Sequence, residues 1–171
     1  LAQLAALKAD ILADATLNAQ PNNSDGAFAV AAAYNLPATP DFWCWRSSVS
    51  KDELVGSTSV DGTVFNWTGL GFITRSQGER DAFRDIFSSD GFINPSLPQV
   101  RQAFLDIFSG AVAPAPANRT HLATVARRKA TRVEKLFATG TPVFGTTGNP
   151  GLMGFEGQLT VQDVETARNL P

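Results

Sequence analysis

The chain has 171 residues, a length that suits one domain with a single hydrophobic core. Its formal net charge of −2 at pH 7 argues against general nucleic-acid binding, which usually shows as a strong basic excess. One cysteine and one histidine exclude an intramolecular disulfide and argue against a single-chain zinc site. No apolar run approaches the roughly 18 residues that span a membrane. We therefore expect no cofactor, no metal and no membrane partner.

Two helices are predicted at the N-terminus, over residues 2–17 and about 25–35. The first has leucine and isoleucine residues at the spacing of one apolar helix face. Pro21 ends it, because proline cannot continue the helical hydrogen-bond ladder. Ser24 is the expected N-cap of the second helix, whose small residues would allow a neighbouring helix to pack closely.

An aromatic cluster follows, in which Phe42, Trp43 and Trp45 surround the single cysteine, Cys44. Large aromatic side chains dominate the burial of apolar surface, so we expect this cluster to anchor a small core. A ligand-stacking patch is the alternative. Cys44 has no histidine nearby and Arg46 is its only basic neighbour, which favours a buried structural thiol over a nucleophile.

Three more helices are predicted in the middle of the chain. Ser50 with Glu53, and Ser76 with Glu79, match the capping box that opens a helix. Ser96 is the expected N-cap of the third. The last two helices share the motif AF-x-DIF, and we expect them to form an antiparallel hairpin whose phenylalanine and isoleucine side chains, Phe87 included, enter one core.

The longest helical pattern covers residues 120–139. Outside its apolar face it holds five of the fourteen lysine and arginine residues: Arg127, Arg128, Lys129, Arg132 and Lys135. Clustered positive charge attracts acidic protein surfaces and nucleic-acid backbones. These five residues are therefore candidate partner contacts, and the alternative is a solvated helix face.

A glycine-rich segment leads to the pattern over residues 155–164, which alternates apolar and polar residues as a strand does. A single strand needs a partner, either residues 141–146 of this chain or a strand of another chain. Its apolar residues are the remaining candidate contacts: Phe155, Leu159 and Val161.

These patterns predict a mainly α protein. We expect a bundle of about five helices over residues 1–139 and a glycine-rich arm with a β-strand or β-hairpin over residues 140–171. The last seven residues, 165–171, are expected to form a loose tail.

No motif for catalysis is found. His121 lies in the first turn of the long predicted helix and is interpreted as a surface or capping histidine. The glycine-rich run 145–154 lacks the lysine of a P-loop. Three aspartates have arginines nearby and are expected to form solvated pairs: Asp81, Asp85 and Asp106. No catalytic, cofactor-binding or metal-binding residue is assigned, and a small cytoplasmic enzyme is the least favoured hypothesis.

The order of the strings WRSSVSKDE, SQGERDAFRDIFS, VRQAFLDIFSG, RTHLATVARRKATRVEKLFATG and FEGQLTVQDV resembles small proteins encoded in the virion structural modules of tailed bacteriophages. The resemblance spans nearly the whole chain. A mostly helical protein of this size with an extended C-terminal arm is similar to the head-to-tail adaptors that sit under the portal.

The resemblance implies a structural ring subunit that joins the portal to the tail and allows DNA passage. Such rings are commonly of twelve copies, so the implied partners are further copies, the portal protein, other neck or tail proteins and, transiently and without sequence preference, DNA. The implied location is the virion, assembled in the host cytoplasm. A capsid decoration protein and a tail-completion protein are the alternatives. The resemblance implies no functional residues.

Overall fold

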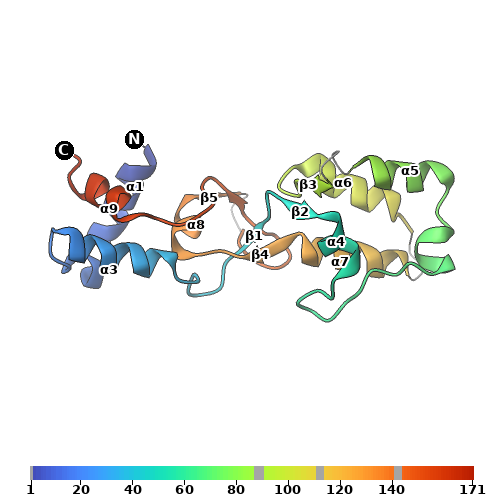
Figure 1. Ribbon diagram of the computed structural model, residues 1–171, viewed down its shortest axis with the longest axis horizontal. Coiled ribbons are helices and arrows are strands. Elements are labelled where there is room, and N and C mark those ends of the chain that lie inside the picture. The colour runs from blue at the N-terminus through green and yellow to red at the C-terminus, as the bar shows by residue number, and fades with distance from the viewer. Residues whose placement is uncertain (1, 87–90, 111–113, 141–143) are drawn as a thin grey trace. The chain divides into compact units, whose positions relative to one another are not determined.

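The computed structural model describes residues 2–86, 91–110, 114–140 and 144–171 (Figure 1). Its regular structure is mainly α, as predicted, with short two-stranded sheets. A bundle of about five helices is not confirmed, because the chain forms two compact units. We call Leu1–Cys44 with Lys129–Pro171 the terminal unit, and Trp45–Arg128 the middle unit. The predicted division between residues 139 and 140 lies inside the terminal unit.

The terminal unit contains both ends of the chain. Its helices are α1 (Ala2–Ala13), α2 (Ala15–Asn18), α3 (Ser24–Asn35), α8 (Arg132–Phe137) and α9 (Val161–Arg168). Helix α9 packs against α1 and α3 (Figure 1). Strand β5 (Ala138–Thr139) pairs antiparallel with β6 (Leu152–Met153), with Ala138 opposite Met153.

The predicted helix over residues 2–17 is interrupted at Asp14. The Asp14 carboxylate accepts hydrogen bonds from the backbone N–H groups of Thr16 and Leu17, so it caps α2 instead of continuing α1. Helix α3 begins at Ser24, and Asn23, not Ser24, is its N-cap. Short polar side chains satisfy the free N–H groups of a first helical turn at either position.

The predicted strand over residues 155–164 is wrong, and so is the loose tail. Thr160 and Asp163 form a capping box that starts α9 within the alternating pattern. Val164 and Ala167 of α9 are fully buried in the core of the terminal unit. The guanidinium of Arg168 donates to the carbonyl oxygens of Leu17, Gln20 and Pro21. The hydrogen bonds of a capped helix and its buried face therefore outweigh the strand pattern.

The prediction of one continuous helix over residues 120–139 is also wrong, although two parts of it are helical. The segment forms the end of α7 (Ala115–Val125), β4 (Arg127–Lys129), α8 and β5. At the break, Ala130 exchanges backbone hydrogen bonds with Ala38 and Phe42. Thr131 then forms a capping box with Glu134 and starts α8. The cap and the extended pairing replace helical hydrogen bonds that the sequence pattern alone would favour.

The middle unit holds α4 (Lys51–Gly56), a π-helix η1 (Gly69–Ile73), α5 (Gln77–Asp85), α6 (Pro98–Ile107) and α7. Strand β2 (Val49–Ser50) pairs antiparallel with β3 (Phe92–Ile93). Strand β1 (Trp43–Trp45) is paired with β4. The predicted capping boxes at Ser50 and Ser76 are confirmed. Ser96 is not a cap, since Leu97 occupies that position without a side-chain bond and Pro98 begins the helix.

The shared AF-x-DIF motif builds the core of the middle unit, and α5 packs against α6 (Figure 1). Phe83, Phe104, Ile107 and Phe108 are buried in one cluster. Ile86 packs against the same cluster from a partly buried position. Phe87 of the same motif lies outside the described residues. The prediction that both helices serve one core is confirmed for the residues that the structure describes.

Phe83→Ala tests this core. The ring of Phe83 lies with its centroid 5.4–5.7 Å from those of Phe65, Phe72 and Phe108. Removing it leaves a cavity, so we expect the free energy of unfolding to fall by about 3–5 kcal/mol in urea denaturation. The control Leu12→Ala truncates a side chain of α1 that is 55% exposed and should change stability by at most about 0.5 kcal/mol. Equal losses in the two variants would contradict this assignment of the core.

Candidate partner-binding surfaces

The five basic residues predicted as partner contacts do not lie on one helix. Arg127 and Arg128 are in β4 and belong to the middle unit, whereas Lys129 ends β4 in the terminal unit. Arg132 and Lys135 are on α8. The predicted basic helix face is therefore divided between the two units.

Three of these cations pair with carboxylates of their own unit at N–O distances of 2.7–3.1 Å: Arg127 with Asp61, Lys129 with Asp41, and Arg132 with Asp10 and Asp14. A nearby carboxylate offsets the field that a cation presents to an approaching anion. These pairs therefore reduce the attraction that the sequence pattern suggests for acidic partners. The side chain of Lys135 makes no ion pair with the described residues.

Arg132 connects α8 to the three N-terminal helices. Its guanidinium contacts the carboxylates of Asp10, on α1, and Asp14, the N-cap of α2. It also lies 4.6 Å from the centroid of the Tyr34 ring, on α3, where a cation–π contact is favourable. The Tyr34 hydroxyl donates to the Asp10 carboxylate. These contacts, which we call the Arg132 network, thus join four helices of the terminal unit.

The network changes the proton affinity of Asp14 and of Tyr34. Hydrogen bonds from the Leu17 N–H and then from Arg132 hold the pKa of Asp14 below its usual value. Burial, followed by the hydrogen bond to Asp10, raises the pKa of Tyr34 above its usual value. At neutral pH, Asp14 is therefore an anion and Tyr34 is a neutral donor.

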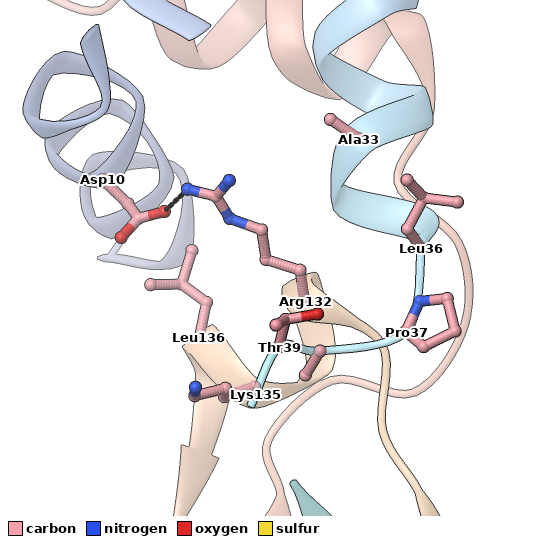
Figure 2. A pocket seen from close by; sticks show the side chains of 9 residues that line it. Asp10, Ala33, Leu36, Pro37, Thr39, Arg132, Lys135 and Leu136 are labelled. Carbon is pink, nitrogen blue, oxygen red and sulfur yellow. Dashed lines mark hydrogen bonds and ion pairs between the residues drawn. The ribbon is translucent and has the colours of Figure 1, made fainter. Parts of the chain in front are cut away.

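A pocket of about 670 Å³ lies beside this network (Figure 2). The Asp10–Arg132 pair forms one side, and Leu36 and Pro37 lie on the other (Figure 2). Arg132 is already bound by carboxylates, and Lys135 and Asp10 contribute opposite charges. The lining therefore selects neither an anion nor a cation, and we assign no ligand to this pocket.

Three polar side chains of α7 are buried: Asn118, His121 and Thr124. We call them the polar row. They recur at every third residue, so they lie along one side of the helix. The Asn118 amide accepts from the Asn66 N–H at 2.8 Å and donates to the Asn66 carbonyl at 3.2 Å. The Asn118 side chain therefore pairs with the Asn66 backbone as a neighbouring strand would.

His121 was predicted to be a surface or capping histidine, and this prediction is wrong, because its side chain is fully buried. Its Nε2 lies 2.8 Å from the Leu54 carbonyl oxygen, and its Nδ1 lies 3.1 Å from the Thr63 hydroxyl. A carbonyl oxygen only accepts, so Nε2 donates to Leu54, and the Thr63 hydroxyl is the partner of Nδ1. Both ring nitrogens are occupied in holding neighbouring segments in place.

Thr124 is the last member of the polar row, and Arg127 of β4 follows it three residues later. Both side chains donate to the carboxylate of Asp61. Gly62, which follows Asp61, has a φ of 75°, where glycine is favoured. The polar row and Arg127 therefore hold the loop between α4 and α5 at three residues: Asp61, Thr63 and Asn66.

The loop that the polar row holds exposes apolar side chains on its other side. We call residues 59–73 the outer loop. Four of its side chains are 44–76% exposed: Val60, Val64, Trp67 and Ile73. Phe65 points inward and stacks on Phe83. The outer loop therefore presents apolar side chains from a backbone with little freedom to rearrange.

The candidate contacts near the C-terminus lie against the core of their own unit. Leu159 is buried, and Phe155 and Val161 pack on the same cluster from partly buried positions. The Asn35 side chain accepts from the Leu159 N–H at 2.8 Å and donates to its carbonyl at 3.0 Å. An amide side chain thus occupies the backbone groups that a partner strand would need.

The remaining sequence-based candidates have structural roles. Cys44 and Phe42 are buried in a small cluster, as predicted, whereas Trp43 and Trp45 are partly exposed. Asp81 pairs with Arg84 at 3.0 Å on the surface, as predicted, and Asp106 accepts from Gln102. Within the described ranges, no three His, Cys, Asp or Glu side chains are placed to share a metal ion. Every helix there is too short or too polar to span a membrane.

Comparison of the chain with protein-family models, with curated proteins and with solved structures finds no match. The candidate surfaces therefore depend on the geometry above and on the residues that form it.

Acid titration tests the Arg132 network. The folded pKa of Asp14 is lowered, so its contribution to stability is complete above the unfolded value of about 3.9 and is lost as the pH falls through the folded pKa. We expect Asp14→Asn to be less stable than the unmodified chain at pH 7. The difference should shrink as urea denaturation is repeated at progressively lower pH, down to about pH 2. A difference that stays constant over this range would contradict the role of the Asp14 charge.

Asn118→Ala tests the polar row. It leaves the Asn66 N–H and carbonyl without their partner, so we expect a loss of about 1–3 kcal/mol in the free energy of unfolding. Hydrogen exchange at the Asn66 amide should accelerate at the same time. The control Thr120→Ala, at an exposed position two residues further along α7, should leave this exchange unchanged. Protection of the Asn66 amide that survives Asn118→Ala would show that other contacts hold the loop.

Proposed function

We propose that this chain is a structural protein of a tailed-phage virion, and specifically a subunit of a head-to-tail adaptor ring between portal and tail. The observation that carries the proposal is the outer loop, which leaves four apolar side chains 44–76% exposed. The order of sequence elements, which resembles virion structural proteins, supplies the biological setting.

Buried polar side chains are costly unless their hydrogen bonds are made. The polar row places three of them under the outer loop, and Phe65 anchors it from within. These contacts preorganise a segment whose apolar side chains, Val60 and Val64 among them, are exposed to water. Preorganisation reduces the entropy lost on association. Apolar groups held in this way are suited to contact with another protein.

The ion pairs of the basic residues agree with a ring through which DNA passes. Arg127, Lys129 and Arg132 have carboxylate neighbours, and the net charge is −2. Tight binding of DNA requires many uncompensated cations against phosphates. Paired cations allow weak, sequence-independent contact, which does not arrest the passing duplex.

A capsid decoration protein or a tail-completion protein would use the same kind of apolar surface, so these remain the alternatives. Immunogold labelling of intact particles separates them. We expect label at the single vertex where the tail joins. Label distributed over the whole capsid would contradict the adaptor proposal in favour of decoration.

Assembly is tested by light scattering of the purified chain, alone and mixed with portal protein. We expect a discrete large oligomer, or a ring that forms only on the portal. A monomer that also fails to bind portal would overturn the proposal.

The double variant Val60→Asp/Val64→Asp tests the outer loop directly. Charges at these exposed positions would have to be desolvated in an interface, so we expect assembly or portal binding to weaken at least about tenfold. The circular dichroism spectrum should be unchanged. The control Leu97→Asp adds a charge at another exposed apolar position of the middle unit, where aspartate suits the N-cap of α6. Normal assembly of the double variant would exclude the outer loop as the contact.

A further inference from the structure

Two arginines of the middle unit are partly buried without an acidic partner among the residues that the structure describes. Arg101 donates to the carbonyl oxygens of Pro95 and Ser96 at 2.6 and 2.7 Å. Arg119 donates to two backbone carbonyl oxygens at the end of α6 and just after it. Within the described ranges, neither guanidinium makes an ion pair. Backbone carbonyls orient both groups but do not neutralise them.

A pocket of about 190 Å³ has these two arginines in its lining, and its other residues are apolar: Trp45, Phe104, Leu105, Ala123 and Ala126. The guanidinium of Arg101 lies 4.8 Å from the Trp45 ring centroid, and burial lowers its pKa. The volume is below the roughly 300–1,000 Å³ of small-molecule sites. The pocket, which we call the arginine pocket, is therefore suited to one apolar side chain with a carboxylate beside it.

The terminal unit carries such a pair of side chains. Asp25 and Phe28 lie three residues apart on α3 and so are neighbours on its surface. Asp25 is exposed and makes no ion pair with the described residues. Phe28 is 66% exposed, the largest exposed fraction among the phenylalanines of the described ranges. An aromatic ring and a free carboxylate thus point away from the same helix.

We propose that Asp25 and Phe28 of one copy dock into the arginine pocket of a second copy. The Phe28 ring contacts the apolar wall, and the Asp25 carboxylate faces the two guanidinium groups. The contact rests on the proposed ring function and names the surfaces that would join successive copies of the ring, which leaves the outer loop for contact with the portal. It joins two different surfaces of the same chain, so each copy offers one of each. Such heterologous contacts generate closed rings or open filaments, whereas isologous contacts stop at a dimer.

Two variants, one on each surface, test the contact. Phe28→Ser removes the ring, and Leu105→Glu places a charge on a pocket residue that is 51% exposed, where the fold should tolerate it. We expect each variant alone to remain monomeric under conditions in which the unmodified chain assembles. If the unmodified chain assembles only on portal, the same comparison is made there. Circular dichroism spectra that match the unmodified chain establish that both variants fold.

Mixing the two variants gives the distinguishing result. Each copy keeps one intact surface, so we expect a one-to-one dimer and nothing larger. Asp25→Arg should also prevent assembly, and Asp25→Arg combined with Arg119→Asp in one chain should restore it at least tenfold. These outcomes depend on the pairing of the two surfaces and do not follow from a general loss of stability.

Other results overturn the proposal. Normal assembly of Phe28→Ser would exclude the contact, even if Leu105→Glu fails, because the pocket would then hold a different occupant. Two folded monomeric variants that form no dimer on mixing would also exclude it. In both cases rings of the unmodified chain would leave the adaptor function standing. A monomeric unmodified chain that does not bind portal would instead remove the function on which this inference rests.

Discussion

The terminal unit depends most on the contacts that the guanidinium of Arg132 makes. Helix α8, with six residues, is too short to be stable alone, so its position comes from tertiary contacts. Arg132 binds Asp10 and Asp14 on one side. Two residues later, Glu134 is buried and accepts from the Gly157 N–H. A single short helix thus links the first helices of the chain to the segment before its last one.

The middle unit solves a similar problem with side-chain amides, hydroxyls and an imidazole. Much of its chain between α4 and α5 lacks regular hydrogen bonding, and buried backbone groups need partners. Asn118 and His121 supply some of them from α7. In both units, polar side chains join segments of the chain, a role that longer helices or wider sheets fill in other proteins. The exposed apolar groups of the outer loop are held in position by this buried framework.

Local signals in the sequence predicted local structure well. The capping boxes at Ser50 and Ser76 and the AF-x-DIF core follow from short-range rules, which depend on neighbouring residues. The errors arose where distant residues decide. Nothing near Ala130 indicates that Phe42 and Ala38 pair with it and interrupt the helix. The polar row, however, left a visible signal, since Asn118, His121, Thr124 and Arg127 recur at intervals of three. That spacing, on a helix with a buried face, could have predicted that His121 lies in the interior and not on the surface.

The order in which the two units occur along the chain has a consequence for synthesis. The middle unit is one continuous segment, Trp45–Arg128, whereas the terminal unit needs both Leu1–Cys44 and Lys129–Pro171. Helices α1 and α3 pack against α9, which is synthesised after the whole middle unit. Domains generally fold as units while synthesis proceeds. The middle unit can therefore be complete on the nascent chain while the buried faces of α1 and α3 are still uncovered, and the chaperones of the cell are the natural protection for that interval.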